Sequence, residues 1–250
     1  MSDLTDRIAL VTGGGAGIGA ACSRSFAATG ATVVVADRDR AAADAVTASI
    51  LGSGGKATAA TVDVADSASV SALIDSIVAQ HGRLDIGVNN AGIGGAQLGI
   101  AELTDAEWAE TRSINLDGVF YCMRAEILQM KKQGGGVIVN MASILSVVAW
   151  PGAAPYIGAK HGVLGLTRSG AIDYAADGIR VNAVGPGFIS TDLVKNGLPP
   201  ETYDMLAGMH PIGRMGTPEE VAKLVLFLAS DDSSNMTGGY YPVDGGYTIR

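Results

Sequence analysis

The sequence predicts an α/β fold: a single domain spanning residues 1–250, in which helices cover both faces of a doubly wound, seven-stranded parallel sheet. Short segments rich in Val and Ile alternate with longer helical patterns along most of the 250 residues. The strand-like segments are nearly continuous in apolar residues, as is typical of parallel strands buried on both faces. The length suits one large domain, and no linker or internal repeat divides the chain.

Seven segments are expected to form the strands. Each is short, and most are rich in the β-branched residues that fit a buried pleated surface. Right-handed crossovers between them would place ligands at the C-terminal ends of the strands. The expected strands are Ile8–Thr12, Thr32–Ala36, Ala57–Val62, Leu84–Asn89, Val137–Met141, Ile179–Ala183 and Tyr240–Val243.

The segments between the strands carry apolar residues at helical spacing. Pro218 suits a helix start, because it fixes φ and needs no hydrogen-bond donor there. The segment Gly187–Gly216 lacks strong regularity and contains three prolines, so we expect a lid over the site. The expected helices are Gly17–Thr29, Arg40–Ser53, Ser67–Gln80, Asp105–Lys132, Ala154–Ala176 and Pro218–Ser230.

Charge and composition exclude several classes of partner. The formal net charge of −8 argues against nucleic acid, because phosphate binding needs a basic face. No apolar run reaches the roughly 18 residues of a membrane span, and the first residues are short and polar, unlike a secretory signal. We expect no nucleic acid or membrane partner and a cytoplasmic location.

The cysteines and histidines do not form a recognisable ligand set. Cys22 and Cys122 lie in apolar stretches and are expected to be small buried side chains. His81, His161 and His210 lie far apart in the sequence, so no metal site is assigned.

A glycine-rich turn follows the first expected strand. Gly13, Gly17 and Gly19 stand in a G-x-x-x-G-x-G spacing, which differs from the G-x-G-x-x-G fingerprint but serves the same purpose. Such a turn lets the backbone approach a pyrophosphate, and the helix N-terminus favours its charge. Asp37 ends the next strand, where a carboxylate accepts hydrogen bonds from ribose hydroxyls and repels a 2′-phosphate. NAD is therefore favoured, although Arg38 could in principle meet a phosphate.

A second motif lies about 140 residues downstream. Tyr156 and Lys160 are spaced i, i+4 and share a helix face, and Ser143 follows an expected strand. A neighbouring ammonium and a positive nicotinamide would lower the tyrosine pKa toward the working range. Tyr156 could then exchange a proton with a hydroxyl, and Ser143 could bind the substrate oxygen. A hydrolase with Ser143 as nucleophile is disfavoured, because there is no G-x-S-x-G elbow or suitably placed histidine.

These motifs together resemble the short-chain dehydrogenase/reductase family, in its compact subclass of about 250 residues. The resemblance covers residues 6–247 and implies a Rossmann fold. It extends to the Asn89–Gly92 segment and to the closing Asp244–Gly246 segment. The cofactor-binding residues that it implies are Gly13, Gly17, Ile18, Gly19, Asp37, Asp63, Val64, Asn90, Ala91, Gly92, Tyr156, Lys160, Pro186, Gly187 and Thr191.

The resemblance also implies the catalytic roles. Tyr156 would be the general acid/base, and Lys160 would bind the nicotinamide ribose and lower the tyrosine pKa. Ser143 would orient the carbonyl or alcohol. Asn115 would hold a water that continues a proton relay from Lys160 to solvent.

The segments that follow the strands should line an apolar substrate pocket. The side chains expected there carry no charge, which suits a neutral secondary alcohol or ketone, including a cyclic or aromatic one. The residues assigned to substrate binding are Ile93, Ser143, Leu145, Trp150, Tyr156 and Phe188.

Three alternatives remain beside this alcohol dehydrogenase or ketone reductase. A sugar dehydrogenase should have a more polar lining. A reductase of carrier-bound 3-oxoacyl chains usually requires NADPH within the family, and it needs a basic patch for its acidic carrier. A non-catalytic NAD-sensing scaffold would not need Ser143, Tyr156, Lys160 and Asn115 together. The sequence does not identify the physiological substrate, the stereochemistry or the direction in cells.

Two expected helices carry apolar residues on more than one face, which suggests burial against another subunit. The family resemblance likewise implies a homotetramer built from paired helices of this kind. The residues in question are Ile114, Val119, Phe120, Met123 and Ile127 in Asp105–Lys132, and Val163, Leu164, Leu166 and Ile172 in Ala154–Ala176.

Overall fold

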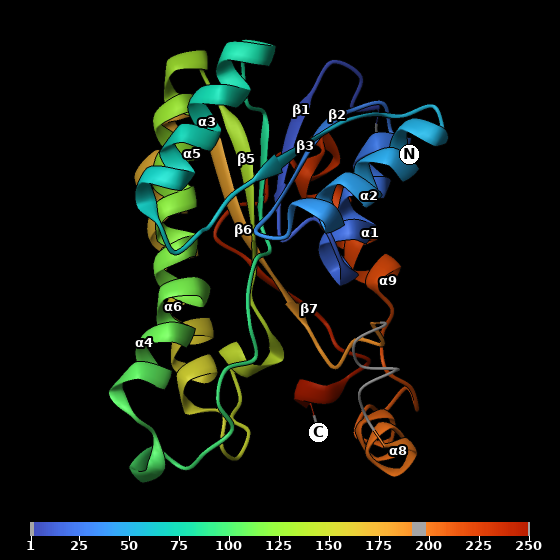
Figure 1. Cartoon of the computed structure of the whole chain (residues 1–250), viewed down its shortest axis with the longest axis vertical. Coiled ribbons are helices and arrows are strands. Elements are labelled where there is room, and N and C mark those ends of the chain that lie inside the picture. The colour runs from blue at the N-terminus through green and yellow to red at the C-terminus, as the bar shows by residue number, and fades with distance from the viewer. Residues whose placement is uncertain (1–2, 192–198, 250) are drawn as a thin grey trace.

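The computed structural model describes residues 3–191 and 199–249, which form one parallel sheet covered by helices on both faces (Figure 1). The strand order is β3-β2-β1-β4-β5-β6-β7, so the order reverses between β1 and β4. This order confirms the doubly wound, seven-stranded sheet that the sequence predicts. The strands are β1 (Ile8–Thr12), β2 (Thr32–Asp37), β3 (Lys56–Thr61), β4 (Ile86–Asn89), β5 (Gly136–Met141), β6 (Ile179–Pro186) and β7 (Tyr240–Val243).

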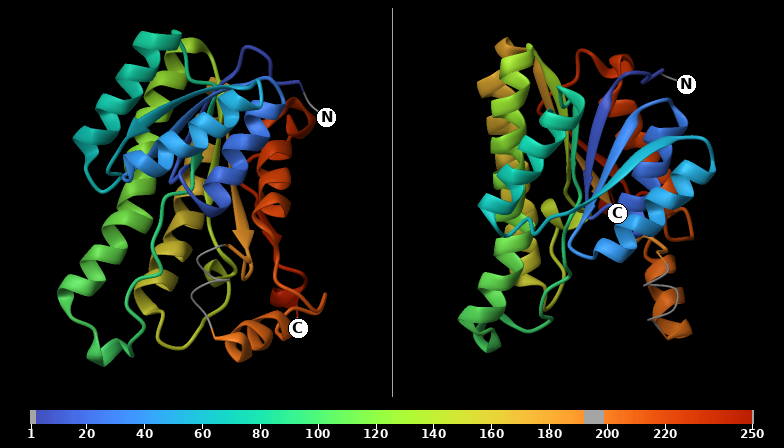
Figure 2. Two further views of the ribbon diagram at one scale, coloured as in Figure 1. Left: turned by 45° about the vertical axis from the view of Figure 1, so that its right-hand side comes forward. Right: turned by 45° about the horizontal axis from the view of Figure 1, so that its top comes forward.

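Two layers of helices enclose the sheet (Figure 2). One face is covered by α1 (Gly17–Ala28), α2 (Arg40–Gly52) and α9 (Pro218–Ala229), and the other by α3 (Ser67–His81), α5 (Gly118–Gln133) and α6 (Ala154–Tyr174). Two shorter helices, α4 (Asp105–Arg112) and α8 (Pro200–Gly208), extend past the sheet at the bottom of Figure 1.

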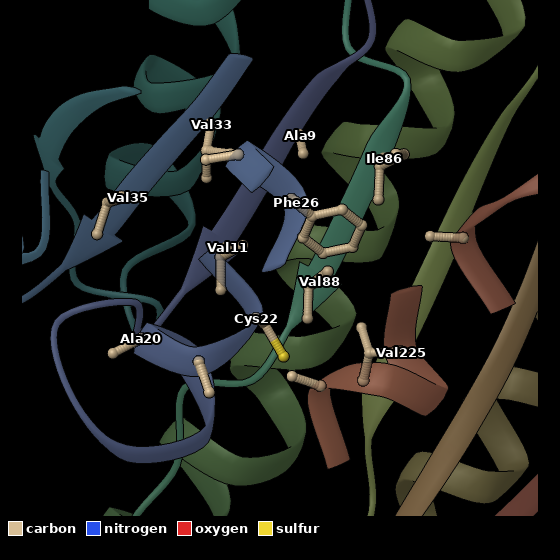
Figure 3. Packing of buried hydrophobic residues seen from close by; sticks show 14 of the residues in the cluster. Ala9, Val11, Ala20, Cys22, Phe26, Val33, Val35, Ile86, Val88 and Val225 are labelled. Atoms are coloured by element: carbon tan, nitrogen blue, oxygen red, sulfur yellow. The ribbon is translucent and has the colours of Figure 1, made fainter. Parts of the chain in front are cut away.

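Alternation along β1 shows why this sequence forms a central strand. Ala9 and Val11 pack in the core on the α1 side, and Ile8 and Leu10 pack in the core on the opposite side. In Figure 3, Phe26 of α1 lies over β1 and β4 in the first of these cores, and only 1% of its surface is exposed. Burial on both faces therefore accounts for the continuous apolar run.

The expected helix Asp105–Lys132 contains a π-helical turn that the sequence did not predict. It consists of α4, a π-helical turn at Ser113–Asp117, and α5. At the junction Gly118 packs closely on Val64, and a Cβ at Gly118 would lie 2.9 Å from a Val64 methyl. The π turn carries Asn115, which is completely buried. Single π turns of this kind are frequent at functional sites.

The expected lid is also more ordered than the sequence suggests. Pro200 occupies the first turn of α8, where a missing N–H does no harm, so the prolines begin a helix rather than preventing one. The ends of the segment are joined, because Ser190 N donates to Gly216 O at 2.8 Å and Gly216 N donates to Phe188 O at 3.1 Å. Residues 192–198 of the expected lid lie outside the described residues.

Both cysteines are free and buried, as the sequence predicts. Burial raises the pKa of the Cys22 thiol to about 12. In residues 3–191 and 199–249, no group of three or more His, Cys, Asp or Glu could hold a metal ion. Within the same ranges, no helix has both the length and the apolar character needed to cross a bilayer.

Candidate active site

A groove with a volume of about 730 Å³ lies at the point where the strand order reverses. Ligands of open α/β sheets bind at this position. Residues that the sequence did not single out, such as Arg24, Ser190 and Glu219, also line it. The predicted cofactor residues that line the groove are Gly13, Gly17, Ile18, Asp37, Asp63, Val64, Asn90, Ala91, Gly92 and Thr191, together with the predicted substrate residue Ile93.

The glycine turn that begins the groove requires its glycines for two reasons. Gly13 and Gly17 have φ values of +61° and +51°, which side chains rarely adopt. A Cβ on Gly13 would lie 2.9 Å from the Ala91 Cα, so β1 and β4 approach too closely for a side chain. Gly19 does not line the groove. It lies beneath the turn, where a Cβ would overlap the carbonyl oxygen of Gly13.

Asn90 fastens the segment after β4 to the glycine turn. Its side-chain Nδ2 donates to Thr12 O at 3.0 Å and to Gly13 O at 3.1 Å. The Thr12 hydroxyl in turn accepts from the backbone N–H groups of Asn90 and Ala91. Thr12 thus has a structural role in the site, and the sequence analysis did not assign it one.

Asp37 lies at the end of β2 and faces the groove. Its carboxylate accepts from Gly15 N at 2.9 Å and from Asp39 N at 3.0 Å, which fixes both oxygens across the mouth of the turn. Arg38 is exposed and also lines the groove.

The residues present fit a nicotinamide dinucleotide. Within the described chain, Ala16 at the N-cap of α1 provides no side-chain hydrogen bond, which leaves the N–H groups of the first turn for an anion. The glycines leave room for close approach of a pyrophosphate, and Asp37 lies where ribose hydroxyls would bind.

Ser143 and Tyr156 meet beside this groove. Ser143 begins a short 3-10 turn, Ile144–Ser146, and its hydroxyl accepts from Leu145 N at 3.1 Å. Its backbone carbonyl accepts from the Tyr240 hydroxyl of β7 at 3.0 Å. Burial raises the pKa of Tyr156 above its usual value, and a hydrogen bond with the Ser143 side chain partly opposes that rise.

The raised pKa of Tyr156 differs from the expectation that Lys160 lowers it. Lys160 is itself buried, with 3% of its surface exposed, and burial lowers its pKa to about 8. Its Nζ donates to Met141 O at 2.7 Å and lies 5.5 Å from the centre of the Tyr156 ring. In the protein alone, desolvation of the phenol therefore outweighs the hydrogen bond with Ser143.

Asn115 uses its side-chain amide to hold the loop after β4. Its Nδ2 donates to Ile93 O at 2.7 Å, and its Oδ1 accepts from Ile93 N at 2.8 Å. A Cβ on Gly92 would lie 3.0 Å from this Oδ1 and 3.8 Å from Lys160 Nζ, so the three residues meet at one point. The water relay assigned to Asn115 stays a prediction.

An apolar cluster adjoins Tyr156. Leu145 and Tyr247 are buried in it, and Trp150, Phe188 and Tyr156 pack against it. The rings of Trp150 and Phe188 stack edge to face with centroids 5.5 Å apart. The assigned substrate residues Leu145, Trp150 and Phe188 thus lie together with Tyr156.

His210 supports this cluster, and the sequence analysis did not identify it. The buried ring accepts from Phe188 N through Nε2 at 3.3 Å and donates from Nδ1 to Leu206 O of α8 at 2.8 Å. A Cβ on Gly187 would lie 2.9 Å from His210 Nε2, which explains a glycine after Pro186. No local pattern around His210 indicates its contact with Phe188, because the two residues are 22 positions apart.

Comparisons with known proteins agree with this geometry. The sequence family described as Enoyl-(Acyl carrier protein) reductase matches residues 13–248. The chain is 42% identical to cyclohexanol dehydrogenase of Acinetobacter sp. (strain SE19), over 98% of this chain and 96% of that protein. It is 45% identical to cis-4-hydroxycyclohexanecarboxylate dehydrogenase of Sinomonas cyclohexanicum, over 97% of each chain. The crystal structure of levodione reductase superposes with a TM-score of 0.94 at 37% identity, over 98% of each chain.

Family match, fold and relatives support an oxidoreductase of the kind that uses a nicotinamide cofactor. The glycine turn, the groove at the strand reversal and the Ser143–Tyr156–Lys160 group are consistent with that activity. The chain belongs to the short-chain dehydrogenase/reductase family.

Proposed function

We propose that this oxidoreductase interconverts a neutral, largely apolar cyclic secondary alcohol and its ketone, with NAD as the cofactor. The observation that carries the proposal is the apolar cluster against which Tyr156 packs. Trp150, Phe188 and Leu145 offer apolar and aromatic surface, and such surface suits an uncharged ring. Two relatives named for alcohols on a cyclohexane ring support a cyclic alcohol, and one of the two alcohols also carries a carboxylate.

The reaction follows from the positions of three side chains. Tyr156 takes the hydroxyl proton of the alcohol or returns it to the ketone, and Ser143 hydrogen-bonds the same oxygen. Lys160 holds a positive charge near the phenol and would bind the ribose of the cofactor. NAD⁺, when bound, supplies the hydride acceptor and its positive ring. Because burial raises the pKa of Tyr156, alcohol oxidation gains most from rising pH, and ketone reduction is favoured at lower pH.

A panel of substrates tests the proposed class. Cyclohexanol, cyclohexanediols, linear secondary alcohols, sugars and an acyl-carrier thioester analogue are compared by kcat/KM with each cofactor, following NADH or NADPH absorbance. We expect the cyclic alcohols with NAD⁺ to give the highest values. Higher values for sugars would favour the sugar dehydrogenase. Higher values for the thioester with NADPH would favour the 3-oxoacyl reductase, and no turnover at all would favour a scaffold.

Asp37 is expected to set the cofactor preference. A fixed carboxylate hydrogen-bonds ribose hydroxyls at about 1.5–3 kcal/mol, which corresponds to a preference of about ten- to a hundredfold before repulsion is added. Asp37→Ser should narrow the ratio of kcat/KM for NADH over NADPH mainly through the KM values. Arg38→Ala is the matched control and should keep the NAD preference. A wild-type enzyme that prefers NADPH would contradict the assignment and point to Arg38.

Tyr156→Phe removes the transferable proton and keeps the ring. Turnover on the best substrate should fall by at least about a thousandfold, within the range of general acid–base catalysis. Binding of NADH, measured by fluorescence, should stay within about twofold, because Gly13, Asp37 and Lys160 are unchanged. Retention of more than a few per cent of activity would show that another group transfers the proton.

We also propose a homotetramer that works in the cytoplasm, where free thiols such as Cys22 stay reduced. Much of the apolar excess that the sequence suggested is buried in the protein's own core, Val119 and Met123 included. Of the residues that suggested an interface, Phe120 on α5 and Ile172 on α6 are exposed, Ile172 over 82% of its surface, and Leu128 on α5 is exposed as well. Such apolar residues suit an interface between copies.

Light scattering with matched variants checks the assembly. The wild type should have about four times the 25.3 kDa chain mass at micromolar concentration. Ile172→Glu should lower that mass, whereas Leu51→Glu, at an exposed apolar residue on α2, should not. A fully active monomer in the wild type would contradict the proposal.

A further inference from the structure

A buried acid on α5 has no role in the reaction as described so far. Glu126 has no exposed surface, and none of the ion pairs found in the described part of the chain includes it. Burial raises its pKa to about 7, which the hydrogen bond from Asn89 opposes. A Cβ on Gly87 would overlap Glu126 Oε1, so β4 leaves space for the carboxyl at this glycine. A side chain held at such a desolvation cost requires an explanation.

Glu126 is the first member of a chain of buried hydrogen bonds. Asn89 Nδ2 donates both to Glu126 Oε2 and to Asn140 Oδ1, each at 3.0 Å. Asn140 Nδ2 then donates to Thr167 Oγ1 at 2.9 Å, and Thr167 Oγ1 donates to Val163 O at 2.8 Å. This series of hydrogen bonds links α5, β4, β5 and α6 in that order.

The carboxyl decides how the two amides point. If Asn89 were turned over, its Oδ1 would face Glu126 Oε2, and two acceptors would meet without a proton between them. The Asn89 NH₂ group donates one hydrogen to Glu126 and the other to Asn140. Asn140 must therefore turn its Oδ1, which accepts, toward Asn89. The NH₂ group of Asn140 then faces Thr167.

These amides lie directly beside the catalytic groups. Asn140 precedes Met141, whose carbonyl accepts from Lys160 Nζ at 2.7 Å. Thr167 is two helical turns after Lys160 and so lies on the same side of α6. Two neighbouring hydrogen bonds, Asn140–Thr167 and Met141–Lys160, therefore fasten the end of β5 to α6.

We propose that Glu126 is a positioning residue of the reaction: through Asn89 and Asn140 it fixes the end of β5 against α6 and so holds the Met141 carbonyl on Lys160. This inference rests on the proposed catalytic role of Lys160. Glu126 touches neither substrate nor cofactor. Both protonation states of the carboxyl keep an acceptor for Asn89, but only the ionised carboxylate excludes the reversed amide, because a protonated carboxyl can donate to Asn89 Oδ1. Its titratable neighbour on α5 is Cys122, and Gly87 and Asn89 of β4 lie against the carboxyl.

Two matched pairs of variants test the proposal. Glu126→Gln keeps an acceptor of the same size, whereas Glu126→Met keeps the length and removes the acceptor. At the other end of the hydrogen-bond series, Thr167→Ser keeps the hydroxyl and Thr167→Val removes it. We expect Glu126→Met and Thr167→Val to lower kcat by about tenfold or more, because small misplacements of catalytic groups slow the reaction. The kcat of Glu126→Gln and Thr167→Ser should stay close to that of the wild type.

A readout at Lys160 separates this role from a merely structural one. NMR titration of labelled lysine side chains should show a lower pKa for Lys160 in Glu126→Met and Thr167→Val, because its ammonium loses an aligned acceptor. Glu126→Gln and Thr167→Ser should leave that pKa within about 0.3 units of wild type, as expected when the acceptor stays in place. Far-ultraviolet circular dichroism confirms that each variant is folded.

The outcomes distinguish the two proposals. A wild type inactive on every substrate would refute the proposed function, while the Lys160 titration still tests the positioning role. A folded Glu126→Met protein with an unchanged pKa of Lys160 would overturn that role. Wild-type kcat in folded Glu126→Met or Thr167→Val would overturn it as well, even if their melting temperatures fall.

Discussion

The buried ammonium of Lys160 is the constraint on which the site depends. A cation with 3% exposure is strongly disfavoured unless an acceptor meets it, and the carbonyl of Met141 does so at 2.7 Å. This one contact joins β5 to α6 and places the charge beside the phenol of Tyr156. Gly92 leaves room above the ammonium, and Asn115 in its π turn fixes the loop that carries Gly92. β5, α6 and the loop that carries Gly92 thus hold the ammonium of Lys160 in a fixed position beside Tyr156.

The second constraint is the close approach of β1 and β4 where the strand order reverses. Gly13 nearly touches Ala91, and Asn90 is hydrogen-bonded to the turn. The groove that results has the backbone N–H groups of the glycine turn and, beside them, the carboxylate of Asp37, an arrangement that suits a dinucleotide with free ribose hydroxyls. Binding and chemistry meet at the ends of adjacent strands, β4 and β5.

Local patterns in the sequence were enough to predict the sheet and to select residues that the structure brings together around the groove and beside Tyr156. Buried strands are visible as apolar runs, and Tyr156 and Lys160 lie within one helical turn of each other. The glycine turn likewise depends on a few consecutive residues. Such features can be predicted because neighbouring residues in the sequence determine them.

Features that depend on distant contacts could not be predicted in this way. The π turn at Ser113–Asp117 carries Asn115, whose amide is hydrogen-bonded to Ile93, 22 residues away. In the sequence, Glu126 cannot be told from an exposed acid on a helix, because its hydrogen-bond partner Asn89 lies 37 residues earlier. The pKa of Tyr156 was expected to fall when the ammonium and a positive nicotinamide are both present; the burial that raises it in the protein alone was not visible in the sequence.

The central claim is that Tyr156 becomes an effective base only when a positive charge is added to its buried surroundings. Ultraviolet difference titration of the wild type against Tyr156→Phe isolates the absorbance of this one tyrosinate. Without cofactor, the account predicts ionisation above the ordinary tyrosine pKa of about 10. With saturating NAD⁺, the midpoint should fall by at least about one unit, the effect of a close positive charge. An identical midpoint with and without NAD⁺ would contradict the account.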